Sequence, residues 1–177
     1  MEELSFEVAK AEHARAINMM REASSVDLTE RLGPGPWTGT SRLQSIRERI
    51  SLGDPDELRR KTIYVASREG QPIASVSVAT FFPTFWKPRY WEDPKAPALG
   101  VFDLVVFPEL QRKGIGQFLM AELERLAKDH GFAYVRLDAF AKNPFSVGFY
   151  RKIGYRECGK IEVRTCPLIL FEKRVLL

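Results

Sequence analysis

In its second half the chain reads Gln111-Arg112-Lys113-Gly114-Ile115-Gly116. The apolar segment 101–107 precedes this stretch and predicts a strand, and apolar residues at helical spacing follow it and predict a helix over 114–129. A loop between a strand and the start of a helix presents unpaired backbone N–H groups, which bind phosphate. The two glycines let such a group approach the backbone closely. The sequence therefore predicts an anion site in this loop.

The composition is that of an ordinary globular protein, with 45% hydrophobic and 28% charged residues among 177,. This length suits one domain, expected to span 1–177, whose core needs no metal or disulfide for stability. The net charge of +4 is small and no long run of Lys or Arg occurs, so nucleic acid is not expected as a partner.

Cysteine and histidine are scarce. Cys158 and Cys166 form no CxxC pair and the chain has two histidines, so no metal site is expected. The acidic start, 1–5, lacks the apolar core of a signal peptide, and no apolar run reaches membrane-spanning length. These features predict a cytoplasmic enzyme or binding protein without membrane contact.

The other elements follow from apolar periodicity and turn residues. A second helix is expected to be capped by Thr40 or Ser41 and to end before Gly53, and another to be capped by Asn143 with Pro144 at its first position. A long loop is expected over 82–98. The remaining predicted elements are a helix over 11–23 and strands over 6–8, 62–66, 73–79, 134–139, 155–163 and 169–176. A turn over 69–72 is expected to join two of these strands as a hairpin, and Gly131 is expected to end the helix over 114–129.

Three kinds of glycine loop bind phosphate groups. A Walker-type loop needs a Ser or Thr for magnesium, which is missing here. A dinucleotide fingerprint needs a third glycine where this chain has Leu119,. The pattern (Q/R)xxGx(G/A) of acyl-CoA pyrophosphate loops matches at every fixed position from Gln111 to Gly116.

A second motif lies where such proteins carry one, and it reads Asn143 followed by Phe149-Tyr150-Arg151-Lys152-Ile153-Gly154-Tyr155. Together the two motifs, over roughly 99–160, resemble the GNAT N-acetyltransferase superfamily, and the variant with Arg136-Leu137-Asp138 ahead of the asparagine is the most similar. The resemblance implies an α/β (α+β) fold. Its mixed, largely antiparallel sheet of six to seven strands, splayed between the fourth and fifth, is flanked by about four helices.

The resemblance also implies acetyl-CoA as cosubstrate, with no metal. Loop amides would hold its pyrophosphate, the fourth strand would bind its pantetheine, and an N–H near Val106 would stabilise the thioester oxyanion. Arg112 and Lys113 would contact phosphate or remain solvated. The residues assigned to acetyl-CoA are Val105, Val106, Gln111, Arg112, Lys113, Gly114, Ile115, Gly116, Gln117, Asn143 and Tyr150.

Proton transfer needs an acid and a base. Tyr150 matches the family tyrosine that protonates the leaving thiolate, and the alternative is a core aromatic beside Phe145 and Phe149. The attacking amine must be neutral, so a group must take its proton. Asp103 interrupts an apolar strand, where burial would raise its pKa, and Asp138 lies near the end of the next strand. For both, a structural carboxylate is the alternative.

In the family, acceptors enter between two loops, here about 28–40 and 82–98. These loops carry Trp37, Trp86 and Trp91, which either seat an organic cation or pack against the protein's own surface. Small amines, amino acids, aminoglycoside-like drugs and protein N-termini all remain open as acceptors, and a homodimer is possible.

The sequence thus favours an N-acetyltransferase that moves an acetyl group from acetyl-CoA to a primary amine of a small molecule or peptide. The amine would attack directly in a ternary complex, because neither 111–116 nor 143–155 holds a cysteine to carry the acetyl group, and Cys158, the nearest, is discounted. A non-catalytic CoA-binding sensor or partner module on the same fold is the alternative, and a nucleotide-binding regulator is a third hypothesis.

Overall fold

The computed structural model describes residues 3–39 and 42–176. Contacts group the chain into two compact units: residues through Ala79 with Asp103–Glu122, and Thr80–Phe102 with residues from Leu123 onward. The division falls within strand β4 (Ala98–Val106) and within helix α3 (Ile115–Asp129). The single domain expected over 1–177 stays a prediction.

The first unit contains an antiparallel set of strands, β1 (Leu4–Val8), β2 (Thr62–Arg68) and β3 (Gln71–Ala79). The predicted hairpin is confirmed. Glu69 and Gly70 at its turn both have positive φ, 50° and 75°, as a tight two-residue hairpin turn requires. Six of the seven residues of β2 are buried.

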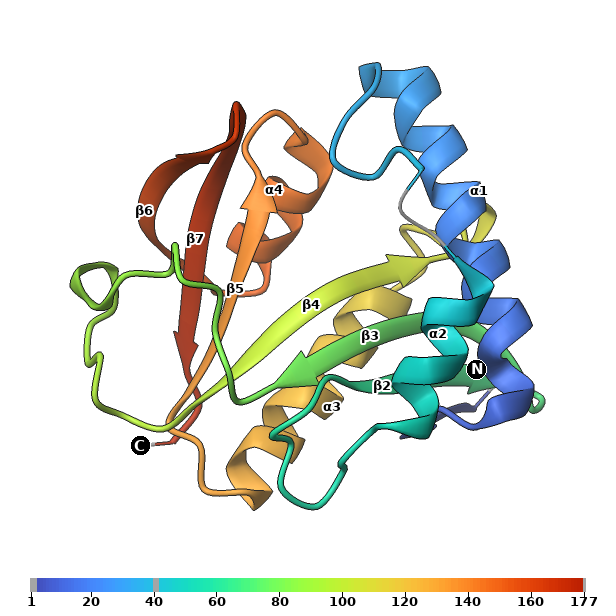
Figure 1. Ribbon diagram of the computed structural model, residues 1–177, viewed down its shortest axis with the longest axis horizontal. Coiled ribbons are helices and arrows are strands. Elements are labelled where there is room, and N and C mark those ends of the chain that lie inside the picture. The colour runs from blue at the N-terminus through green and yellow to red at the C-terminus, as the bar shows by residue number, and fades with distance from the viewer. Residues whose placement is uncertain (1–2, 40–41, 177) are drawn as a thin grey trace. The chain divides into compact units, whose positions relative to one another are not determined.

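Helices α1 (Ala14–Leu32) and α2 (Leu43–Ser51) pack beside β3 and β2 in this unit, as Figure 1 shows. A 3-10 turn, Ala11–His13, precedes α1. The buried residues that join helices and strands are Ala9, Ala14, Ile17, Met20, Ile46, Ile63, Val65 and Val105.

One helix prediction needs correction. The first helix runs to Leu32 rather than 23, because pairs four residues apart such as Arg31–Asp27, 2.9 Å, support a segment without an apolar stripe,. Within this helix, the Met19 side chain is 59% exposed. The predicted caps Thr40 and Ser41 lie outside the described residues.

The second unit holds β5 (Tyr134–Phe140), β6 (Arg156–Val163) and β7 (Cys166–Arg174), with β7 antiparallel to both of the others. Helix α4 (Pro144–Lys152) packs on β5 (Figure 1). A 3-10 turn, Pro88–Tyr90, lies in the loop before β4. Gly131 follows α3 with a φ of 75° and ends it as predicted,.

The strand order is β1-β2-β3-β4-β5-β7-β6. Four α-helices occur in the described residues, so the predicted fold class is confirmed. The parallel pairing of β4 with β5 joins Ala98–Gly100 to Tyr134–Arg136. No helix in the described ranges has the length and apolarity needed to cross a membrane.

Candidate functional site

The predicted phosphate loop follows β4 in the first unit. A 3-10 turn, Pro108–Leu110, leads into it, and Arg112 and Gly114 then take positive φ values of 61° and 83°. Left-handed residues in such a turn direct successive N–H groups toward one side, which is the geometry of an anion-binding nest. A Cβ built on Gly114 would meet nothing within 4 Å, so the space above this residue is open.

The start of α3 supplies further amides. The Phe118 N–H donates to the Gly114 carbonyl, 2.9 Å, so the N–H groups of Ile115, Gly116 and Gln117 precede the first helical bond and lack an intrahelical acceptor. Ile115 is buried and anchors the helix start, whereas Arg112 is exposed. The loop therefore combines a rigid base with an open, donor-rich surface.

The loop is tied to the end of β4. Gln111 Nε2 donates to the Val106 carbonyl, 3.3 Å, and the Phe107 N–H donates to the Ile73 carbonyl of β3, 3.2 Å. The side chains of Val105 and Val106 are buried, so only their backbone groups remain for a ligand.

Asp103 does not have the environment expected from the sequence. It was expected to be buried in an apolar strand, but its side chain is 40% exposed. Its φ of 53° interrupts the extended backbone of β4, and this local distortion turns the carboxylate toward three cations. Burial therefore cannot make it a base, and its nearest partner is Arg49, whose Nη1 lies 3.1 Å from Oδ2.

Tyr150 and Asn143 lie in the second unit. The Asn143 side chain accepts from the N–H groups of Phe145 and Ser146, 3.1 and 3.3 Å, so its predicted cap role is confirmed. Tyr150 is 7% exposed and its ring lies 5.9 Å from that of Tyr155. Burial, with a contribution from the Asp138 carboxylate, raises the pKa of Tyr150 well above its usual range. The phenol therefore keeps its proton at neutral pH.

Asp138, the second base candidate, is held by a tryptophan. The Trp86 Nε1–H donates to Asp138 Oδ2, 2.8 Å, and the indole stacks on Phe102 at 5.4 Å between centroids. This bond fixes one carboxylate oxygen of Asp138 within the unit that carries Tyr150.

The three tryptophans take different positions from those of an open aromatic cage. Trp86 and Trp91 are buried and pack with Leu170. The Trp37 Nε1–H donates to Thr29 Oγ1, 3.2 Å, and its ring covers Gly35 so closely that a Cβ there would lie 2.5 Å away. These contacts agree with the alternative that the tryptophans pack against the protein's own surface. Acceptor binding by these residues stays a prediction.

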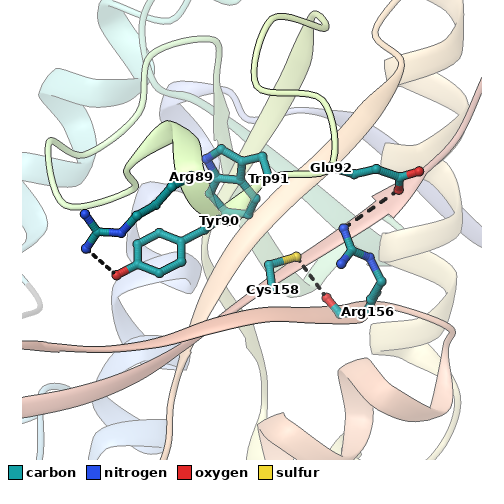
Figure 2. Close-up of a pocket in the computed structure, with 6 residues that line it drawn as sticks. All are labelled: Arg89, Tyr90, Trp91, Glu92, Arg156 and Cys158. Atoms are coloured by element: carbon teal, nitrogen blue, oxygen red, sulfur yellow. Dashed lines mark hydrogen bonds and ion pairs between the residues drawn. The ribbon is translucent and has the colours of Figure 1, made fainter.

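A shallow hollow opens beside Trp91 in the second unit (Figure 2). Its lining residues are Arg89, Tyr90, Trp91, Glu92, Arg156 and Cys158. Most of its polar groups have partners, since Arg156 pairs with Glu92 at 3.7 Å and Arg89 donates to the Tyr90 hydroxyl at 3.0 Å. Burial raises the pKa of the Cys158 thiol to about 12, so this cysteine is not a nucleophile at neutral pH.

Two clusters of charged residues were not predicted from the sequence. Arg136 was considered in the sequence only as part of a motif, but its side chain forms a buried ion pair with Glu172. A charged residue inside each of two apolar strands could have indicated this pair. Arg21 and Arg49 approach Asp103 from positions far apart in the sequence, which no local pattern could reveal. Among the described residues, no group of three or more His, Cys, Asp or Glu side chains could hold a metal.

The model of the acetyltransferase (GNAT) family matches residues 17–155, and no curated protein matched the sequence. Similar solved structures include a GNAT-family acetyltransferase from Streptococcus agalactiae 2603, with 16% identity, a TM-score of 0.76, and 97% of this chain and 95% of that chain covered.

Ribosomal-protein-alanine N-acetyltransferase from Brucella melitensis is 21% identical with a TM-score of 0.70, and 96% of this chain and 99% of that chain are covered. A Salmonella typhimurium acetyltransferase, solved with its cofactor acetyl-CoA, is 13% identical with a TM-score of 0.67, covering 97% and 94%. At these identities the solved structures show the fold, and the family model shows the family. This chain belongs to the acetyltransferase (GNAT) family, whose general reaction is acetyl transfer from acetyl-CoA.

Proposed function

We propose that the protein is an N-acetyltransferase that moves the acetyl group of acetyl-CoA to a primary amine of a small molecule or peptide. The amine attacks the thioester carbonyl directly in a ternary complex, so that a C–N bond forms, the C–S bond breaks and CoA leaves as a thiolate. The observation that carries the proposal is the donor-rich loop at Arg112–Gly114 before α3, in a chain of this family.

The loop supplies the cofactor's anchor. Its open amides would donate to the cofactor's pyrophosphate, and the start of α3 adds a dipole attraction of about 0.3–1 kcal/mol at an exposed helix terminus. Arg112 and Lys113 are exposed beside it and add positive charge where a pyrophosphate would bind.

The end of β4 supplies the groups for the thioester. The backbone of Val105 and Val106 would bind pantetheine, and an N–H near Val106 would donate to the carbonyl oxygen as negative charge develops there. Such a donor contributes about 2.7–4 kcal/mol to transition-state stabilisation in other enzymes. The buried side chains of both valines keep this stretch of backbone in place.

Tyr150 would protonate the leaving thiolate. Because its pKa is raised by burial, it holds a proton and would donate its O–H to the sulfur as the C–S bond breaks. Asn143, which caps the helix that carries Tyr150, is the other residue of this unit assigned to the cofactor.

Two carboxylates are candidates for the general base that takes the proton of the amine. Asp138 interacts electrostatically with Tyr150 and is oriented by Trp86, whereas Asp103 lies among cations. These surroundings favour Asp138, directly or through water. The cytoplasm stays the predicted location and a homodimer remains open.

The proposal is tested by CoA binding and by thiol release with a panel of amines. Gly114→Glu should abolish CoA binding in calorimetry, because it places a carboxylate where the pyrophosphate binds. Gly131→Glu, at the other end of α3, is the matched control, since Gly131 also has positive φ and open space around it. Micromolar binding retained by Gly114→Glu would contradict the loop assignment. CoA binding without thiol release from any amine would instead indicate the non-catalytic sensor.

A further inference from the structure

Three cationic side chains converge on one carboxylate in the first unit. Asp103 Oδ2 lies 3.1 Å from Arg49 Nη1, 3.9 Å from Arg21 Nη2 and 4.0 Å from Lys61 Nζ. Arg21 comes from α1, Arg49 from α2 and Lys61 from the residue before β2. Arg21 and Arg49 alone bring two positive charges to this one carboxylate, so the cluster can accept a further anion.

Part of the Arg21 guanidinium is unsatisfied. The side chain is 15% exposed, and its Nε and Nη2 atoms are buried with no hydrogen-bond partner among residues 3–39 and 42–176. Its distance to Asp103 is that of an ion pair without a hydrogen bond,. Buried N–H groups of a guanidinium are almost always satisfied, and a ligand oxygen beside Arg21 would satisfy these.

The cluster lies on the strand that carries the proposed thioester groups. Asp103 precedes Val106 by three residues, so the two are about 10 Å apart along β4. Val105, between them, packs with Ile17 of α1 and Ile46 of α2, so α1 and α2 cover this part of the strand. The positive φ of Asp103 is a sparsely populated conformation of the kind that concentrates at functional sites.

We propose that Arg21, Arg49 and Lys61 bind a carboxylate carried by the acceptor, so that the acceptor is an amine with a carboxylate, such as an amino acid or a short peptide. This inference rests on the proposed acetyltransferase function. A planar guanidinium matches a carboxylate in shape and charge, and Asp103 holds Arg49 in position through their hydrogen bond. The excess positive charge disfavours polycationic amines of the aminoglycoside kind.

The test uses matched pairs of product-like ligands. N-acetyl amino acids and N-acetyl dipeptides are compared by calorimetry with the N-acetyl amines that lack only the carboxylate, in protein saturated with CoA. The carboxylate should tighten binding about tenfold or more, as expected for hydrogen bonds between charged partners, and high salt should weaken this preference. The better of the two series identifies the source of the carboxylate.

Variants then locate the site. Arg49→Gln should remove the preference for the carboxylate while leaving CoA binding intact. Arg47→Gln is the matched control, because Arg47 is exposed on the same helix. Arg21→Met should act in the same way as Arg49→Gln, with Arg15→Met as its exposed control on α1. Thermal unfolding of each variant shows whether it remains folded. If Arg21→Met does not fold, the result for Arg49→Gln decides the test, because Arg49 is the more exposed of the two arginines.

Equal binding of the paired ligands, failure of both series to bind, or a preference that survives Arg49→Gln would overturn the carboxylate site. Thiol release with neutral amines at the same rate as with carboxylate-bearing ones would also overturn it while supporting the acetyltransferase. Loss of CoA binding in Gly114→Glu, together with equal binding of the pairs, would likewise leave the proposed function standing without this inference.

Discussion

Arg136 and Glu172 are directly opposite each other on β5 and β7, and both side chains are 1% exposed. Arg136 Nε lies 3.3 Å from Glu172 Oε2, and Arg136 Nη2 donates to the Asp93 carbonyl at 2.6 Å. The guanidinium also lies over the Trp91 ring, 4.8 Å from its centroid. On the other side, Glu172 Oε1 accepts from the Glu92 N–H at 2.8 Å. The ion pair therefore holds the loop before β4 against the sheet of the second unit.

Removing one partner of this pair should be costly. Arg136→Met leaves the buried Glu172 with the half-exposed Arg156 as its remaining ion-pair partner among the described residues, which is expected to lower the free energy of unfolding by about 3 kcal/mol, the lower end of the range for a broken buried pair. Urea denaturation measures the loss. Arg174→Met, an exposed arginine on β7, should stay within about 0.5 kcal/mol of wild type. The double variant Arg136→Met/Glu172→Leu should recover part of the loss, and a double variant worse than the sum would show that the charges are not the cause.

Tyr150→Phe separates chemistry from cofactor binding. Loss of the O–H should lower kcat about a hundredfold, the lower range for general acid catalysis, with little change in acetyl-CoA affinity. Steady-state kinetics and calorimetry together measure the two effects. Tyr155→Phe is the matched control, because Tyr155 is a buried neighbour in the same aromatic cluster with no proposed part in the reaction. Equal losses of turnover and affinity, or no loss in either, would count against the acid role.

The pH profile of turnover should rise toward alkaline pH. The amine must lose its proton before it attacks, whereas Tyr150 keeps its proton because burial raises its pKa above the usual value. We therefore expect no falling limb from Tyr150 below about pH 10, the ordinary tyrosine value. Initial rates across this range test the point. A decline at lower pH that disappears in Tyr150→Phe would show that the phenol ionises in the neutral range.

Stability should fall in alkaline solution. Burial raises the pKa of Tyr64 to about 12, and it raises the pKa of Tyr150 and of Tyr155 above the usual range. Between the unfolded value of about 10 and these higher values, the unfolded chain binds fewer protons than the folded one. The free energy of unfolding then decreases with pH, and the contribution is fully present below about pH 10. Thermal unfolding at rising pH measures this, and Tyr64→Phe should reduce the slope.

The features predicted correctly from the sequence depend on neighbours along the chain. Asn143 with Pro144 specifies a helix start through local hydrogen bonds, and Glu69-Gly70 specifies the turn of a hairpin. The positive φ of Gly114 follows from the same kind of local rule. Each of these depends on residues within a few positions, so a pattern in the sequence can carry it.

The features that the sequence did not reveal depend on residues far apart. Asp103 was expected to be buried, but a local distortion of β4 and an arginine 54 residues away bring it to the surface. Trp86 reaches Asp138 across 52 residues, and no local pattern predicts this contact. Composition and spacing fix which residues are apolar or charged, and they do not fix which distant partners satisfy them.

The bond between Trp86 and Asp138 gives a test of the base. Asp138→Asn keeps a hydrogen-bond acceptor for the indole but removes the negative charge, so kcat should fall about a hundredfold while acetyl-CoA affinity and the unfolding temperature change little. Asp103→Asn is the comparison, since it removes the other candidate carboxylate. A loss of turnover confined to Asp103→Asn would move the base to the first unit. An amine can also lose its proton to solvent before it binds. Turnover would then be unchanged in both variants, and the rate would follow the pKa of the free amine. That result would show that the protein supplies no base.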